Sequence, residues 1–361
     1  MKVEKAKLKS ALSKLAVLVN KENTQDGNPT RILFEAENGK ISLTSCDGSS
    51  LGIFSFETAD QSSMDFVCDY RTLSAATVMR GDVDLVCENG ILTISQGDTK
   101  MKYPVKGKDS YPTERREVES EKELVISSEK LKKLMGKISY IRKEKDPRPF
   151  TTGIHMVYDG EKLQMEATDG PRIYRNFTLM GEKQDYSFNG VIVARTVKLI
   201  ESIEDEVEVH IKMDDTAISI QTGDMKVYLP NLNVKFPPIG KLFDNFFNND
   251  QQVSFKLDKS ISLESIGIFS VSDNKALSLS NENGKLLFSM DDGVTDIKDK
   301  IDFLKFSGED FQFAIDLDLF GNLFKNLRDS ESVEFIWEEE TSPVYFRDEE
   351  NMDGLLMPLK K

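Results

Sequence analysis

The sequence predicts an α+β fold built from three repeated domains, each with two helices and antiparallel sheets. Three segments carry this prediction, because each is a turn dipeptide, a lysine, a strand of alternating residues and a closing Asp-Gly. The segments are NGKISLTSCDG at 38–48, DGEKLQMEATDG at 159–170 and NGKLLFSMDDG at 283–293. Their closing glycines lie 122 (170 − 48) and 123 (293 − 170) residues apart, and such equal spacings indicate an internal repeat.

A second pair of segments supports the repeat. LTISQGDTKMKYP at 92–104 is similar to ISIQTGDMKVYLP at 218–230, and the two lie 126 residues apart (218 − 92). The chain is therefore expected to hold three domains, at residues 1–119, 120–248 and 249–361. We place their boundaries near an acidic stretch at 117–123 and a polar stretch at 248–252.

Each domain is expected to contain a leading helix and a second, shorter helix. Apolar residues recur at helical spacing in the first two leading helices, at Leu8, Leu12, Leu15 and Val19 and at Leu131, Leu134, Ile138 and Ile141. The third leading helix falls at DKSISLESIGIF, and the shorter helices fall at 71–81, 194–205 and 317–329. Asn-Gly at 38, 89, 189 and 283 and Asp-Gly at 159 predict hairpin turns, because these pairs accept positive φ angles.

Composition indicates a globular cytoplasmic chain. Hydrophobic residues make up 39% and charged residues 30%, close to the globular average. The sequence has no apolar run of about 18 residues, and the charged start MKVEKAKLKS leads into no apolar signal segment. Cys46, Cys68 and Cys87 are expected to be reduced core thiols. Metal ligation is the alternative, but no C-x-x-C or C-x-x-H spacing accompanies them, and we predict no metal and no cofactor.

The distribution of charge favours DNA, although the net charge of −15 should repel phosphate on average. Between residues 2 and 21, six lysines stand against one acid, Glu4. Between residues 130 and 145, seven basic residues stand against Glu144 alone, whereas acids dominate stretches such as 337–353. Basic helices on an acidic chain suit contact with double-stranded DNA that neutralises phosphates without reading bases.

An enzyme is the less favoured interpretation, and we predict no catalytic residue. The two histidines, His155 and His210, lie in strand-like contexts without a metal-ligand spacing. Ser127-x-x-Lys130 and the Ser-Asp-Asn at 272–274 match two motifs of serine acyl-enzymes, but the third motif, Lys-Thr-Gly, is absent. No phosphate-binding glycine loop occurs, so ATP chemistry should belong to a partner. The rival from another class is a β-rich interaction scaffold that does not encircle DNA.

Four stretches carry a resemblance to the bacterial sliding clamp family, the β subunit of DNA polymerase III. ATDGPRIYR at 167–175 resembles the family's A-T-D-G-H-R-L, and FPPI at 236–239 resembles its F-P-D-Y. VIVARTVKLIESI at 191–203 is similar to its V-I-V-P-R-K…L helix, and the ending SPVYFRDEENMDGLLMPLKK is similar to its terminus. These stretches follow the family's order along the whole chain.

The resemblance implies a non-catalytic processivity factor, a head-to-tail homodimer that closes into a ring around duplex DNA. Helices would line the hole and sheets would form the outside. The implied partners are double-stranded DNA, the replicative DNA polymerase, an ATP-dependent clamp loader and other proteins with a clamp-binding peptide. The candidate DNA contacts are Lys7, Lys14, Lys21, Arg71, Lys132, Lys133, Lys137, Arg195, Lys198 and Lys325. The third leading helix offers only Lys259.

The resemblance also implies a groove that takes a short partner peptide with a glutamine and paired apolar residues. The corresponding positions are Thr151, Thr168, Gly170, Pro171, Arg172, Ile173, Pro237, Lys241, Leu242, Leu355, Leu356, Met357, Pro358 and Leu359. The alternative is a terminal edge strand that simply closes the last sheet. Pro171 replaces the family's histidine, and Ile239 and Gly240 replace its tyrosine and first arginine, so the peptide preference stays open.

For ring closure, the resemblance places Tyr103 and Val105 of one protomer against Ile268 and Phe269 of the other. Lysines surround the first pair at 99–108, whereas five aspartates stand between 291 and 302. Opposite charges at the two ends of one chain suit a head-to-tail contact. Asp169 recurs at equivalent Asp-Gly turns in all three repeats, so we expect it to serve backbone geometry rather than catalysis.

Overall fold

The computed structural model describes residues 1–19, 30–111, 118, 120, 122–143, 146–181, 183–193, 195–232, 234–244, 252–340 and 342–360. The chain divides into two compact units. Unit 1 holds Met1–Lys132 and Arg195–Asn233, and unit 2 holds Lys133–Ala194 and Val234–Lys361. The predicted α+β class with antiparallel sheets is confirmed.

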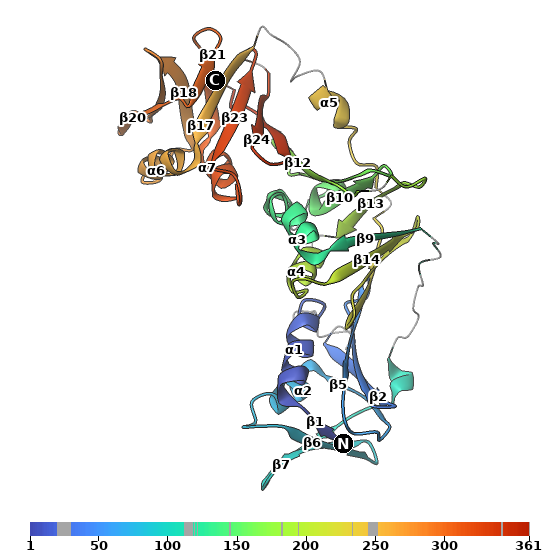
Figure 1. Ribbon diagram of the computed structural model, residues 1–361. Coiled ribbons are helices and arrows are strands. Elements are labelled where there is room, and N and C mark those ends of the chain that lie inside the picture. Colours follow the sequence, from blue (N-terminus) through green and yellow to red (C-terminus); the bar gives the residue numbers. More distant parts are fainter. Residues whose placement is uncertain are drawn as a thin grey trace. The chain divides into compact units, whose positions relative to one another are not determined.

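The same order of elements occurs three times along the chain: strand, helix, four strands, shorter helix, three strands (Figure 1). The first repeat consists of β1 (Lys2–Val3), α1 (Lys5–Leu15), β2 (Arg31–Glu37), β3 (Lys40–Cys46), β4 (Leu51–Glu57), β5 (Met64–Asp69), α2 (Tyr70–Ala76), β6 (Val83–Glu88), β7 (Ile91–Gln96) and β8 (Thr99–Pro104). The second consists of β9 (Glu123–Ser127), α3 (Ser128–Gly136), β10 (Gly153–Tyr158), β11 (Lys162–Thr168), β12 (Arg172–Leu179), β13 (Phe188–Val193), α4 (Arg195–Glu201), β14 (Glu208–Met213), β15 (Ala217–Gln221) and β16 (Met225–Pro230). The third consists of β17 (Val253–Asp258), α6 (Lys259–Phe269), β18 (Ala276–Glu282), β19 (Lys285–Asp291), β20 (Asp296–Asp302), β22 (Gln312–Asp316), α7 (Leu317–Lys325), β23 (Ser332–Trp337), β24 (Val344–Asp348) and β25 (Met352–Leu356).

Two elements stand outside this order, α5 (Gly240–Asp244) and the short strand β21 (Lys305–Ser307). The predicted domain boundaries at 119, 248 and 249 lie outside the described residues, so the three-domain division stays a prediction.

Each unit joins the sheets of two repeats. In unit 1 an eight-stranded sheet runs β5-β2-β3-β4-β16-β15-β14-β9, and in unit 2 a nine-stranded sheet runs β13-β10-β11-β12-β25-β24-β23-β17-β21. We call the β4–β16 pairing the first seam and the β12–β25 pairing the second seam. Leu51 lies opposite Tyr228 in the first, and Arg172 lies opposite Leu356 in the second. Two four-stranded sheets, β1-β6-β7-β8 and β20-β19-β18-β22, leave β8 and β20 as edge strands.

The helices are shorter than their apolar spacing predicts. The stretch predicted as helix at 71–81 ends at Ala76, and the one at 317–329 ends at Lys325. After α3 ends at Gly136, Ile138 and Ile141 are still buried, because a short 3-10 turn continues over the core. The regular spacing of buried apolar residues therefore continues past the end of the helix.

Three of the predicted Asn-Gly hairpins are confirmed. Asn38, Asn89 and Asn283 have φ angles of 52°, 50° and 54°, and each is followed by a glycine with positive φ. The fourth prediction is wrong, because Asn189 lies inside β13 opposite Val157 and its side chain contacts His155. No helix among the described residues is long and apolar enough to cross a membrane.

Candidate functional site

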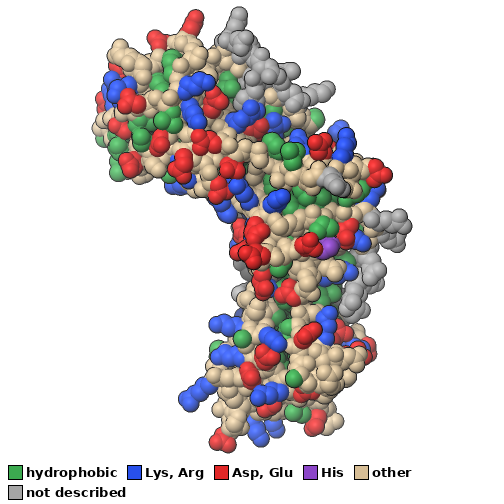
Figure 2. Space-filling view, in the orientation of Figure 1, with side chains coloured by type: hydrophobic (Ala, Val, Ile, Leu, Met, Phe, Trp, Pro, Cys, Tyr) green, Lys and Arg blue, Asp and Glu red, His purple; other side chains and the backbone are tan. Residues whose placement is uncertain are grey.

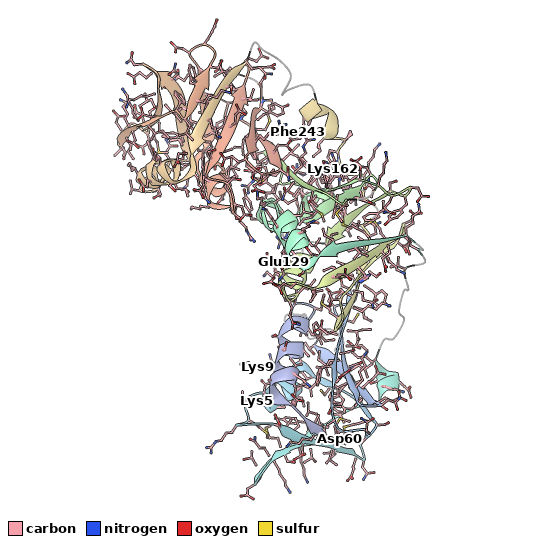
Figure 3. The ribbon with its side chains drawn as sticks, in the orientation of Figure 1. Lys5, Lys9, Asp60, Glu129, Lys162 and Phe243 are labelled. Carbon is pink, nitrogen blue, oxygen red and sulfur yellow. The ribbon has the colours of Figure 1, made fainter. Side chains whose placement is uncertain are left out.

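Exposed basic side chains occur on the helices of unit 1. Arg71 on α2 and Lys198 on α4 are exposed, and Lys7 on α1 is 41% exposed, with Nζ 2.9 Å from Glu4 Oε1. Lys9, which was not among the predicted contacts, is also exposed on α1 (Figure 3). Figure 2 shows Lys and Arg side chains gathered over the part of unit 1 that holds α1 and α2.

Two predicted contacts fall partly or wholly outside the described part. Lys21 lies outside the described residues, and Arg195 begins α4 without a described side chain. In unit 1, Lys132 is paired with Asp205 at 2.6 Å, and in unit 2, Lys325 is exposed on α7.

Lys14 was predicted to contact DNA, and the structure contradicts this. Its side chain is buried, with Nζ 3.3 Å from Glu204 Oε1 and 3.1 Å from Asp224 Oδ2. The ammonium also lies 4.4 Å from the centre of the Phe54 ring. The reason is that this side of α1 packs against β4, so the lysine faces the first seam rather than solvent.

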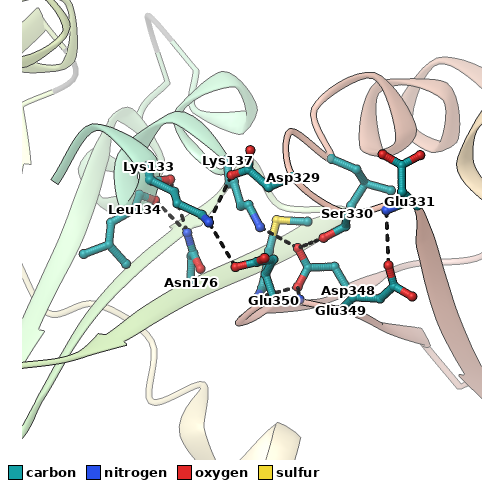
Figure 4. Close-up of polar contacts among 12 residues, drawn as sticks. Lys133, Leu134, Lys137, Asn176, Asp329, Ser330, Glu331, Asp348, Glu349 and Glu350 are labelled. Atoms are coloured by element: carbon teal, nitrogen blue, oxygen red, sulfur yellow. Dashed lines mark hydrogen bonds and ion pairs between the residues drawn. The ribbon is translucent and has the colours of Figure 1, made fainter. Parts of the chain in front are cut away.

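Lys137 is a second correction. The side chains of Lys137 and Asp348 are both fully buried, with Nζ 2.7 Å from Oδ2 (Figure 4). The same carboxylate accepts hydrogen bonds from Ser330 Oγ and from the backbone N–H groups of Glu350 and Met352. Lys137 therefore joins the second seam and cannot reach a phosphate.

Lys133, one turn earlier on α3, stays at the surface. Its Nζ lies 3.1 Å from Asp329 and 3.0 Å from Glu350. The hydrogen bond with Glu350 is the main cause that raises the pKa of Lys133, and the bond with Lys133 lowers the pKa of Asp329. Lys133 is 44% exposed and therefore remains a candidate contact, although it is already neutralised by two acids.

In the nine-stranded sheet, Arg172 and Leu356 point to one face, whereas the predicted groove residues Ile173 and Leu355 lie opposite each other on the other face. An apolar cluster of Phe236, Ile239, Phe243, Ile336, Tyr345 and Leu355 packs there against Phe150 and Ile173. The N–H of Met357 donates to the carbonyl of Pro171 at 2.8 Å, which ties the C-terminal segment to the turn after β11. We call the six buried residues of this apolar cluster, together with Phe150 and Ile173, the groove cluster.

The predicted groove residues divide into a buried layer and an exposed layer. The buried members are Thr151, Thr168, Arg172, Leu355 and Leu356. Members at the surface are Gly170, Pro171, Leu242, Met357 and Leu359, with Ile173, Pro237 and Pro358 partly exposed. Lys241 lies in α5, and its side chain is outside the described part. Only the exposed layer can contact a partner directly.

Asp169 does not serve the role that the repeats predicted. Asp47 Oδ1 accepts from the N–H groups of Ser49 and Ser50, and Asp292 Oδ1 makes the same turn bonds in the third repeat. Asp169 Oδ2 instead accepts from Nε of Arg172 at 2.9 Å. The acid of the second repeat therefore holds the side chain of Arg172, because Pro171 has no N–H to donate where Ser49 and Val294 donate theirs.

The residues predicted for ring closure divide in the same way. Tyr103 and Val105 are partly exposed on or beside the edge strand β8, and Ile268 is 48% exposed at the end of α6. Phe269 is a correction, since it is fully buried in the core, 6.2 Å from the ring of Phe288. A neighbour that sequence reasoning missed, Val271, is 81% exposed.

Comparison with known proteins agrees with this arrangement. Residues 125–238 match the family model described as the DNA polymerase III beta subunit, central domain. The beta sliding clamp of Streptococcus pneumoniae serotype 4 is 25% identical over 230 residues, which span 60% of this chain and 58% of that protein. The beta sliding clamp of Chlamydia muridarum is 20% identical over 284 residues, 77% of this chain and 76% of that protein.

The family model thus matches the central part of the chain, and the relatives and solved structures that resemble it are sliding clamps. Solved structures of sliding clamps share the whole fold of this chain. The beta subunit of Pseudomonas aeruginosa superposes with a TM-score of 0.91 at 16% identity over 100% of both chains. The sliding clamp of Bacillus subtilis gives 0.91 at 16% identity over 100% of this chain and 98% of that one. A P. aeruginosa clamp bound to griselimycin gives 0.92 at 17% identity, over 100% and 99%.

Proposed function

We propose that this chain is a DNA sliding clamp, a non-catalytic processivity factor that encircles duplex DNA and tethers the replicative polymerase. The observation that carries the proposal is the pair of seams together with two edge strands, β8 and β20, each of which has a partner on one side only among the described residues. The first seam joins β4 to β16, and the second joins β12 to β25. In the third repeat the equivalent of β4 is β20, and in the first repeat the equivalent of β16 is β8. A second copy of the chain can therefore close the series by pairing its β8 with β20.

The internal seams also set the register of this closing pair. Leu51 follows Asp47 by four residues, as Asp296 follows Asp292, and both turns use the same Asp bonds. Tyr228 lies 126 residues after Lys102, the spacing of the second repeated segment. Because Leu51 faces Tyr228, Asp296 of one copy should face Lys102 of the next. Lys100 falls opposite Lys298, whose Nζ lies 3.0 Å from Asp296.

We place DNA against the helices, where contacts with the phosphates are weak and do not depend on the base sequence. The candidates that the structure leaves exposed are Lys7, Arg71, Lys133, Lys198 and Lys325, joined by Lys9. Cations that meet phosphates without specific geometry allow the protein to slide, and their effect falls steeply with salt. Exposed acids after α4, at Glu204, Asp205 and Glu206, discourage tight local binding.

The groove cluster is the proposed docking place for partner peptides from the polymerase, the clamp loader and other clamp-binding proteins. Three apolar residues of the predicted groove, Leu242, Met357 and Leu359, are 46%, 39% and 38% exposed. Leu and Met suit a surface that accepts several peptides. A cytoplasmic location beside the chromosome follows from this function.

A loading experiment separates the clamp from a scaffold that never encircles DNA. The intact chain is loaded onto nicked circular plasmid with a clamp loader and passed through a gel-filtration column in high salt. A clamp is retained on the circle and lost when a restriction enzyme linearises the plasmid. Equal retention on circular and linear DNA would contradict the proposal.

A further inference from the structure

A row of polar side chains crosses the nine-stranded sheet beneath the groove cluster. His155 on β10 lies opposite Glu166 on β11, and Glu166 lies opposite Arg175 on β12. Across the second seam Arg175 lies opposite Asp353 on β25, and Asp353 lies opposite Arg347 on β24. We call these five residues the polar row. The row spans both repeats that form unit 2.

The polar row contains two bonded groups, His155 with Glu166 and Arg175 with Asp353 and Arg347. His155 Nδ1 lies 2.6 Å from Glu166 Oε2, and Arg175 contacts Asp353 through Nε and through Nη2 at 2.8 Å from Oδ2. His155 Nε2 lies 2.7 Å from Asn189 Oδ1. Both atoms that face the histidine ring are oxygens, so a ring nitrogen that carries a proton donates to the oxygen beside it. Charges of alternating sign follow one another across four of the five strands.

Two members of the polar row carry the aromatic side chains of the segment that precedes and forms α5. Phe236 stacks on His155, with ring centroids 4.4 Å apart and planes 18° apart. The guanidinium of Arg175 lies 4.0 Å from the centre of the Phe243 ring. Both phenylalanines belong to the groove cluster, and Phe243 is labelled in Figure 3. Segment 236–243 thus rests at one end on a hydrogen-bonded imidazole ring and at the other on a guanidinium group.

A purely structural role does not account for the chemistry of this row. Glu166 and Asp353 are 4% and 3% exposed, and His155 is 8% exposed. Burying charged groups costs desolvation, and well-packed apolar residues at such places are often at least as stable. Apolar residues at these positions would not fix the orientation of the aromatic rings that pack on them. A planar guanidinium or imidazole fixed by a carboxylate presents one defined face to an aromatic ring.

We infer that the polar row is the device that positions segment 236–243 as a wall of the partner groove. His155 and Arg175 act as positioning residues, through Phe236 and Phe243, and they touch no peptide themselves. The inference rests on the proposed docking function of the groove cluster. It further implies that the second seam and the groove are coupled. Arg175 pairs with Asp353 across the seam, and the same guanidinium packs on Phe243 of the groove cluster.

The first experiment needs no peptide. Hydrogen exchange is followed in the intact chain at Ile239 and Leu242, whose N–H groups donate within the segment at 2.8 and 2.9 Å. The variants are His155→Gln, which removes the ring, and Arg175→Lys, which keeps the charge but not the planar fork. Exchange at both amides is expected to accelerate about tenfold. The matched control is His210→Gln, since His210 is a strand histidine 3.3 Å from Glu123 in unit 1.

The second experiment measures binding of a synthetic peptide in which a glutamine precedes two apolar residues. The variants should weaken its binding about tenfold through a faster off-rate, while unfolding of the rest of unit 2 stays unchanged. Unchanged exchange at Ile239 and Leu242 in both variants would overturn the inference, whatever the peptide does. A wild-type chain that binds no peptide, combined with accelerated exchange in the variants, contradicts the docking function but supports the positioning role.

Discussion

The two seams use a lysine from the same position of the repeat in two different ways. Lys14 and Lys137 are each the tenth residue counted from the start of their leading helix, and they lie 123 residues apart (137 − 14). At the first seam the acids that hold Lys14 are 70% and 44% exposed. At the second seam Lys137 and Asp348 are both fully buried.

The difference shows how burial changes the value of one ion pair. At the first seam the acids of the pair are solvated although Lys14 is buried, and an ion pair open to water in this way contributes little, about 0–1 kcal/mol. A buried pair contributes specificity, and removing one partner leaves an uncompensated charge that costs about 3–5 kcal/mol. The first seam is thus held mainly by strand pairing, whereas the second depends on its polar contacts.

The largest effect is expected from Asp348→Ala. Lys137 would stay buried without a carboxylate, so the free energy of unfolding of unit 2 should fall by about 3–5 kcal/mol. Urea unfolding monitored by exchange in β24 and β25 measures it. Glu350→Ala, which removes an exposed partner of Lys133, is the control and should cost less than about 1 kcal/mol. Equal losses in the two variants would show that burial does not distinguish the seams.

The tenth residue of the third leading helix is Ile268, which is exposed where the other repeats bury a lysine. We expect Ile268→Asp to disrupt pairing with a second copy, because it places a carboxylate in an apolar contact beside the aspartates of β20. Light scattering should then report a monomer mass, as it should for Tyr103→Asp. Val125→Asp, at an exposed valine of β9, is the control that should keep the dimer. A dimer mass for Ile268→Asp would contradict the assignment.

A smaller effect is expected at the first seam. Lys14→Met removes a pair whose acids remain solvated, so the cost should be below about 1 kcal/mol and should vanish at high salt. The same salt titration should leave the loss in Asp348→Ala unchanged. Thermal unfolding at low and high salt measures both.

The lysines of the seams should also differ from exposed cations in DNA binding. Arg71→Gln should lower the slope of log K against log salt concentration by about 1, whereas Lys14→Gln should leave the slope unchanged. Fluorescence anisotropy with duplex DNA over a range of salt concentrations measures the slope. An equal change for both variants would return Lys14 to the DNA contacts.

The smallest effect concerns pH at the hairpin of the second seam. The hydrogen bond from Lys256 and a second bond from Ser332 lower the pKa of Glu349 from 4.5 to about 2. A carboxylate with a lowered pKa contributes stability above its unfolded pKa and loses it as pH falls through the folded value. Glu349→Gln should therefore destabilise slightly at neutral pH and match the wild type near pH 2, as circular dichroism can measure.

Much of the fold could be predicted because its signals are local. The Asn-Gly turns and the alternating strands at β3, β11 and β19 are readable within a dozen residues. Whether Lys14 and Lys137 are buried or exposed could not be predicted. The acids that pair with Lys14 lie 190 and 210 residues away along the chain, and the acid that pairs with Lys137 lies 211 residues away. Whether a helical lysine faces solvent or a seam depends on these distant partners.

The groove shows the same limit. Its exposed positions followed from the motif at 167–175 and from the chain end, since each is a short stretch. The polar row joins residues from 155 to 353 through strand register, and no spacing along the chain records it. The different role of Asp169, which bonds Arg172 rather than the turn backbone, could not be predicted because the three Asp-Gly turns have equivalent positions in the repeats.

The central claim is that two copies close a ring by repeating the internal seams, and a cross-linking measurement tests it most directly. The chain carrying Lys102→Cys and Asp296→Cys is oxidised in dilute solution and run on a denaturing gel without reductant, beside the unchanged chain with its own three cysteines. The out-of-register pair Lys102→Cys and Asp302→Cys is the control. The account predicts a covalent dimer from the first pair alone. A monomer, a ladder of higher oligomers or an equal dimer yield from the control pair would contradict it.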